Sequence, residues 1–255
     1  MTDQSAPESG NETEGGLIEH LLELRTRLMR GLVGLAVVLV ALLPFANRLF
    51  SWLALPLMDK LAGDGKLVAI GVVTPFFTPM RLAFFLAVLI SVPWLLYQMW
   101  AFVAPGLYQR EKKLAVPLLV SAVMLFYAGC AFALFIVLPS VFAFLAHIKP
   151  ESVVQMPDIN AYLDFVVVIC LTFGLSFELP VAMVILALLG WVTPEQLKQA
   201  RGYAIVGVFV VAAIITPPDV ISQLMLAVPM CLLYEIGIFA ARIVSRRRQP
   251  QQEAG

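Results

Sequence analysis

The chain has 255 residues, of which 61% are hydrophobic and only 13% are charged. Soluble domains carry about 45 to 50% apolar and about 25% charged residues, so this composition excludes an ordinary soluble domain. Seventeen Lys and Arg residues balance seventeen Asp and Glu residues. The net charge therefore predicts no polyanionic partner, and no nucleic acid in particular.

Six long stretches of the chain carry almost no charge, and each predicts a membrane span. They lie between Arg30 and Arg48, between Arg81 and Arg110, from Lys113 to about Pro139, from Asp164 to Thr193, from Gly202 to Thr216 and from Ile221 to Ala241. The stretches are continuously apolar, without the alternation of barrel strands, so they indicate helices. We expect an all-α integral membrane protein with six transmembrane helices.

The prolines and the span lengths predict irregular helices. Several prolines fall inside or at the ends of the spans, so kinked helices are expected. The fifth span would be only about 22 Å long, against a hydrocarbon core of about 30 Å. The sixth span is interrupted by Pro229. We therefore expect short fifth and sixth spans.

The basic residues predict the orientation of the chain, because cytoplasmic loops are enriched in Lys and Arg. The N-terminal segment, the loops after spans two and four, and the C-terminal tail together hold twelve Lys and Arg, and the opposite connections hold five. This asymmetry places both termini in the cytoplasm. If one weak segment failed to span, the termini would lie on opposite sides.

The charge pattern also divides the chain into three parts. Residues 1–16 are acidic and polar, so we expect a disordered cytoplasmic tail. Residues 17–242 would form the six-helix domain, beginning with an amphipathic helix on which leucines recur at helical spacing. Glu23 and Arg27 lie four residues apart on that helix, so Glu23 is either a solvated helix charge or a functional carboxylate. Residues 243–255 would form a basic cytoplasmic tail.

Motifs for catalysis are missing from the sequence. It contains no Walker-type glycine loop and no His-Glu-x-x-His. Ser176, in Gly174-Leu175-Ser176, has no histidine nearby in the sequence to activate it. Cys130, Cys170 and Cys231 stand apart in apolar runs. We therefore predict no enzyme, no metal and no cofactor.

Three further acidic residues occupy unusual places. Glu178 is the only charge in the fourth span, and acids inside the membrane are costly and usually functional. Glu111 follows the second span, next to two lysines that would balance a simple loop charge. Asp219, in Thr216-Pro217-Pro218-Asp219, is placed to cap the sixth helix after a tight turn.

Five motifs in order give the sequence a family resemblance. They are His20-Leu21-Leu22-Glu23-Leu24-Arg25-Thr26-Arg27-Leu28, Thr74-Pro75-Phe76-Phe77-Thr78-Pro79, Trp100-Ala101-Phe102-Val103-Ala104-Pro105-Gly106-Leu107-Tyr108 ending at Glu111, Phe173-Gly174-Leu175-Ser176-Phe177-Glu178-Leu179-Pro180, and Thr216-Pro217-Pro218-Asp219. Over roughly residues 17 to 242 the chain resembles TatC, the multispanning subunit of the twin-arginine protein translocase.

The resemblance implies a receptor for the signal peptides of folded export substrates. It implies assembly with the single-span proteins TatA and TatB in an oligomeric complex of the bacterial inner membrane, driven by the proton gradient. Glu23 and Glu111 would receive the paired arginines, with Arg25 and Phe102 from the same motifs in the signal-peptide site. Glu178 would be an intramembrane contact for a partner.

Two further expectations complete this interpretation. Pro56 and Asp219 are expected to shape structural turns. A secondary transporter that protonates Glu178 is the alternative function. It would require internal repeats with paired broken helices, and the two halves of the sequence show no convincing repeat.

Overall fold

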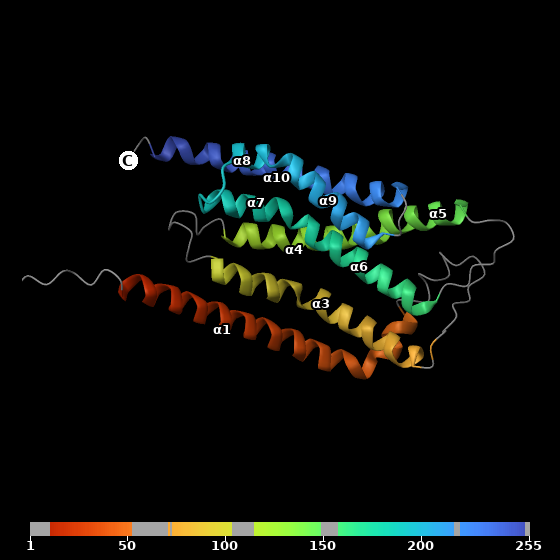
Figure 1. Ribbon diagram of the computed structural model, residues 1–255. Coiled ribbons are helices and arrows are strands. Elements are labelled where there is room, and N and C mark those ends of the chain that lie inside the picture. Colours follow the sequence, from red (N-terminus) through yellow and green to blue (C-terminus); the bar gives the residue numbers. More distant parts are fainter. Residues whose placement is uncertain are drawn as a thin grey trace, which may run out of the picture.

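Figure 1 shows the computed structural model of the chain, which describes residues 11–52, 71, 73–103, 115–148, 158–216 and 220–252. These residues form helices, and none of them forms a β-strand. Within these ranges, five helical stretches are long and apolar enough to cross a membrane, namely Leu21–Trp52, Thr74–Phe102, Val116–Phe144, Ile159–Leu188 and Val220–Ser245. The predicted class, an all-α membrane protein with several spans, is confirmed.

The helices follow the order of the predicted spans. The first span is α1 (Asn11–Leu42) with the 3-10 turn η1 (Leu43–Phe45), and the second is α3 (Thr74–Val103). The third comprises α4 (Ala115–Phe132), the π-helical turn η4 (Ala133–Val137) and α5 (Leu138–Ile148). The fourth comprises α6 (Ile159–Phe177) and α7 (Leu179–Leu188). The short α8 (Pro194–Gln199) precedes α9 (Arg201–Ile215) and α10 (Val220–Gln252).

The two helices predicted as the last spans differ in length, which corrects one prediction. The helix predicted as the fifth span, α9, has only 15 residues, as expected. The helix predicted as the sixth is not short, because α10 has 33 residues and continues through Pro229. A proline removes one backbone hydrogen bond, and neighbouring helices in a membrane protein can compensate for it. Packing of α10 against α7 and α9 therefore keeps one long helix where the sequence suggested an interruption.

Prolines change the helices at two other places. The π-helical turn η4 ends two residues before Pro139, and the third span continues beyond this proline to Phe144 instead of ending there. In the fourth span Glu178 is both the C-cap residue of α6 and the N-cap residue of α7, and Pro180 lies in the first turn of α7. The predicted irregularity of the spans thus takes the form of a π turn and a helix break.

The N-terminal helix extends beyond its predicted limits. α1 begins at Asn11, within the segment predicted to be disordered, and it runs without a break into the first span. Adding residues to an existing helix is much easier than nucleating a new one, so an amphipathic helix next to a span readily merges with it. At the other terminus α10 reaches Gln252, inside the predicted basic tail.

The spans run up and down in one bundle, with α1 at one edge and α9 and α10 at the opposite edge (Figure 1). The start of α1, the end of α3, the end of α7 and the end of α10 lie at the same end of the bundle. We call this the basic end, because its described residues include Arg25, Arg27, Arg30, Lys198, Arg201 and Arg242.

The centre of the bundle is formed around α6, where Ile169, Cys170 and Phe173 are fully buried. In contrast, only 6% of the most apolar window of the first span is buried, against 44% in the fourth span. An apolar helix with so little of its surface covered by protein requires lipid or another helix around it. Of the five candidate spans in the described residues, the first is therefore the most open to neighbours in the membrane.

Candidate functional site

Glu23 lies on the face of α1 that packs against α3. Glu23, Arg27, Gly31 and Gly34 follow one another at intervals of four, four and three residues, so they share one helix face. A Cβ atom on Gly31 would lie 3.3 Å from Leu95 of α3. The side chain of Glu23 is only 33% exposed, whereas the neighbouring leucines of α1 point outward. The glutamate is therefore aimed toward the second span.

An arginine of the same helix already binds this carboxylate. Nη2 of Arg27 donates to Oε1 of Glu23 at 3.0 Å, and Nε of Arg27 donates to the same oxygen at 3.3 Å. No described residue donates a hydrogen bond to the second carboxylate oxygen, Oε2. Glu23 thus accepts a guanidinium on one oxygen and presents the other oxygen to an incoming donor.

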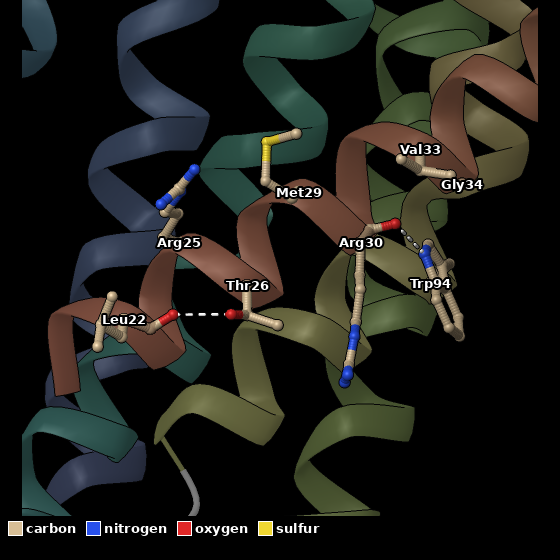
Figure 2. Close-up of a pocket in the computed structure, with 8 residues that line it drawn as sticks. All are labelled: Leu22, Arg25, Thr26, Met29, Arg30, Val33, Gly34 and Trp94. Carbon is tan, nitrogen blue, oxygen red and sulfur yellow. Dashed lines mark hydrogen bonds between the residues drawn. The ribbon is translucent and has the colours of Figure 1, made fainter. Parts of the chain in front are cut away.

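A shallow groove of about 520 Å³ lies along the same part of α1, and Figure 2 shows the residues that line it. Its lining comes from α1 and from one residue of α3, and consists of Leu22, Arg25, Thr26, Met29, Arg30, Val33, Gly34 and Trp94. The indole Nε1 of Trp94 donates to the backbone oxygen of Arg30 at 3.1 Å, which ties the two helices together.

Arg25, one of the predicted site residues, belongs to this groove and not to the Glu23 pair. Figure 2 shows the side chains of Arg25 and Arg30 extending away from each other. Neither guanidinium forms an ion pair with another described residue. Two unpaired arginines make the surface beside Glu23 strongly positive, so the carboxylate stands in a cationic neighbourhood.

The other predicted residues of the signal-peptide site lie at or beyond the end of α3. Phe102 is half-buried in the last turn of α3, at the same end of the bundle as Glu23. Glu111 lies outside the described residues, as do Pro56 and Asp219. The structure therefore brings Glu23 and Phe102 to one end, while the roles of Glu111, Pro56 and Asp219 stay predictions.

Glu178 stands at the break between α6 and α7, inside the fourth span. The ten residues of α7 separate it by about 15 Å from the end of that span. Its Oε1 is buried and has no hydrogen-bond partner among the described residues. A buried carboxyl oxygen without a partner is costly, so it marks a place where another polar group would be stabilising.

Glycines hold the two helices on either side of Glu178 in close contact with their neighbours. A Cβ on Gly129 of α4 would lie 2.6 Å from the backbone oxygen of Phe173 in α6. A Cβ on Gly237 of α10 would lie 3.2 Å from the backbone Cα of Pro180 in α7. Backbones that approach this closely fix the position of the intervening glutamate.

The packing of a glycine of α1 against a tryptophan of α3 was missed from the sequence. Its central residues are Gly34 and Trp94, and a Cβ on Gly34 would lie 2.5 Å from the indole. The pair Gly31 and Gly34, on the face that carries Glu23, was the available signal, because small residues at helical spacing allow close packing of membrane helices.

Comparisons with known proteins agree with the fold. Residues 19–229 match the family model of the Sec-independent protein translocase protein (TatC). The chain is 46% identical over 237 residues to the TatC of Escherichia coli K12, covering 93% of this chain and 92% of that protein. It is 48% identical over 227 residues to the TatC of Halothiobacillus neapolitanus, covering 89% of this chain but only 62% of that longer protein.

Two solved structures resemble the chain as a whole. A crystal structure described as the twin-arginine translocase receptor TatC has a TM-score of 0.79 and 36% identity, and covers 89% of this chain and 99% of its own. A second crystal structure of TatC, in the detergent DDM, has a TM-score of 0.77 and 35% identity.

The apolar spans, the break at Glu178 and the half-buried Glu23 define a multi-pass helical membrane protein with polar groups placed along its bundle. The chain belongs to the TatC family of Sec-independent protein translocase proteins. This is a family of translocase components and not a known family of enzymes.

Proposed function

We propose that the chain is the receptor component of a twin-arginine translocase, and that Glu23 and Glu111 together bind the paired arginines of the signal peptide. The observation that carries this proposal is the state of Glu23, a half-buried carboxylate that already accepts a guanidinium and faces the second span. A planar guanidinium forms paired hydrogen bonds with a carboxylate, which a lysine ammonium cannot reproduce.

The course of the chain supports a shared site for the two glutamates. Glu23 lies on α1 at the basic end, and α3 ends at Val103 at the same end, eight residues before Glu111. The two helices are antiparallel neighbours along their length. Only a short segment then separates the end of α3 from the second glutamate. Phe102 and Arg25 would contribute an apolar and a polar wall beside the two carboxylates.

The basic end of the bundle faces the cytoplasm in this proposal, with six spans and both termini on that side. The alternating direction of the helices and the common end of α1 and α10 support an even number of crossings. The short α9 would form the fifth crossing, with the bilayer or its flanking residues adapting to its length. The membrane would be the bacterial cytoplasmic membrane, because the named relatives are bacterial.

Glu178 serves in this proposal as a polar contact for a single-span partner, TatA or TatB. Its unpartnered Oε1 favours a partner side chain that donates a hydrogen bond. The assembled, oligomeric complex would move folded proteins at the expense of the proton gradient. The chain itself would perform no covalent chemistry.

Binding of a signal peptide to membranes that contain the full chain tests the proposal. The double variant Glu23→Gln, Glu111→Gln keeps the side-chain volume but removes both charges. Each charge-assisted contact is worth about 1.5 to 3 kcal/mol, so each loss should weaken binding roughly ten- to a hundredfold. Glu195→Gln is the control, because it removes an exposed acid of α8 at the same end. Wild-type binding by the double variant would refute the assignment.

A further inference from the structure

Arg27 occupies the carboxylate that is proposed to receive the ligand. Both of its hydrogen bonds end on Oε1 of Glu23, and this is the only ion pair of α1 among the described residues. The pair is also partly withdrawn from solvent, with Arg27 25% and Glu23 33% exposed. Glu23 therefore has a bound guanidinium before any signal peptide arrives.

An incoming arginine would present the same chemical group to the same carboxylate. Two guanidinium groups on one carboxylate repel each other, and Arg25 and Arg30 add further positive charge nearby. The segment from Glu23 to Arg30 holds one acid and three arginines. A second cation is thus bound there most favourably when the first one leaves.

We propose that Arg27 is a resting ligand of Glu23 that the first bound arginine of the signal peptide displaces. The inference rests on the proposed function, because it requires Glu23 to be part of the arginine site. Space is available for the displaced side chain of Arg27, because α1 lies at the edge of the bundle and the neighbouring residues on α1 are exposed. The displaced guanidinium would turn outward to water and lipid headgroups, as long basic side chains near the ends of membrane spans do.

The displacement sets a threshold for binding. Breaking the internal pair reduces the binding free energy of every ligand that needs Glu23 by the same amount, whether the ligand carries arginine or lysine. The ratio of the two affinities would stay constant. The dissociation constants of weak ligands, however, would rise above the concentrations at which those ligands occur. Arg27 would in this way exclude signal peptides that lack the arginine pair.

The test is a titration of membranes that contain the full chain with a labelled signal peptide carrying two arginines, and with the same peptide carrying two lysines. In Arg27→Gln both peptides should bind about two- to fivefold more tightly, the range expected for a partly exposed ion pair. Arg30→Gln is the matched control, because Arg30 has the same charge but no ion pair with a described residue. Its gain should be smaller, since its charge acts only through a screened field.

A coupling measurement separates this inference from the proposed function. In a Glu23→Gln background, Arg27→Gln should bring no more than the small gain of Arg30→Gln, because the carboxylate for which Arg27 competes is gone and only its screened charge remains. If Glu23→Gln does not weaken binding at all, the proposed site is wrong. If Glu23→Gln weakens binding but Arg27→Gln weakens it too or leaves it unchanged, only the displacement is wrong, and Arg27 is then a group that positions Glu23.

Arg27→Lys keeps the inference testable if the glutamine variant fails to accumulate. It preserves the positive charge and the orientation signal, yet replaces the fork by a single ammonium that is easier to displace. It should bind both peptides more tightly than the wild type, by a smaller factor than the glutamine variant. Weaker binding, or binding equal to the wild type, would overturn the proposal.

Discussion

Gly34 of α1 lies directly against the indole of Trp94 in α3. A Cβ at position 34 would lie 2.5 Å from both Cδ1 and Nε1 of that ring, and the same Nε1 donates to the backbone oxygen of Arg30. One contact therefore sets the distance between the first two spans and ties the side chain of Trp94 to the backbone of α1. The orientation of Glu23 depends on it, because Glu23 shares this face of α1.

Gly34→Ala should loosen the contact between α1 and α3. The added methyl would force the indole away and break its hydrogen bond, and overpacking of this kind typically costs about 1 to 3 kcal/mol. We expect a lower midpoint when the fraction of monodisperse protein in detergent is followed against temperature.

Gly207→Ala in α9 is the matched control for this substitution. A Cβ at that position has no atom within 4 Å, so the substitution introduces no clash. Alanine has a higher helix propensity than glycine by up to about 1 kcal/mol, so the midpoint should stay or rise. A fall at position 207 as large as that at position 34 would show that the indole contact is not the cause.

The sequence predicted the spans well where length and charge decide, and less well where packing decides. The 15 residues between Gly202 and Thr216 limit any helix there, and α9 is short as expected. Pro229 gives no such limit, because its effect depends on the helices around it, and α10 continues through it.

The same distinction holds for the candidate site. The family motif singles out Glu23, and the spacing of four residues predicts its pair with Arg27, which the structure confirms. That the pair faces α3 follows from the packing of Gly31 and Gly34. The spacing of the two glycines indicates a face of α1 that can pack closely, but this contact is between segments far apart in the chain, so the spacing does not say which helix covers that face.

The proposed orientation is tested by labelling single cysteines in sealed cells. Cysteines at Ser5 and Gln251 should be protected from a reagent that cannot cross the membrane, and a cysteine at Asp64 should react. The excess of Lys and Arg at the basic end is the physical reason, because positive charge is retained in the cytoplasm. Reaction at either terminus before the membrane is opened would contradict six spans with both ends inside.

Two polar contacts join α3 and α6 at the end opposite the basic end, and they should differ in strength. The buried hydroxyl of Thr78 lies within hydrogen-bond distance of two acceptors, Oδ1 of Asn160 in α6 and the backbone oxygen of Thr74, and shares its one proton between them. Nearby, Arg81 pairs with Asp164 at 2.7 Å, but both side chains are more than half exposed. Exposed pairs contribute about 0.2 to 1 kcal/mol, while a buried group that loses its partner costs about 1 to 3 kcal/mol.

Thr78→Val should therefore lower the thermal midpoint in detergent more than Arg81→Gln does. Valine has nearly the same volume as threonine, so the substitution removes the hydroxyl without opening a cavity. The effect of Arg81→Gln should also shrink as salt is added, whereas that of Thr78→Val should not. Equal losses at both positions would mean that burial does not decide the strength of these contacts.

Glu178 is expected to bind a partner helix and not to hold the chain together. Its Oε1 has no hydrogen-bond partner among the described residues, and the flanking helices are fixed by the contacts of Gly129 and Gly237. On insertion scales a charged residue in the middle of a span costs about 2.5 to 3.5 kcal/mol, so its replacement by leucine should not impair insertion. Glu178→Leu should accumulate at normal levels but lose crosslinks to the helices of TatA or TatB.

Glu178→Gln separates the polar contact from the negative charge. Glutamine has nearly the same shape, accepts a hydrogen bond through its oxygen and donates through its nitrogen. It should therefore retain much of the crosslinking that leucine loses. The amount of folded protein in each membrane must be measured beside the crosslinks. If Glu178→Leu reduces the folded protein while crosslinking per folded molecule stays unchanged, the glutamate stabilises the break between α6 and α7 and is not a partner contact.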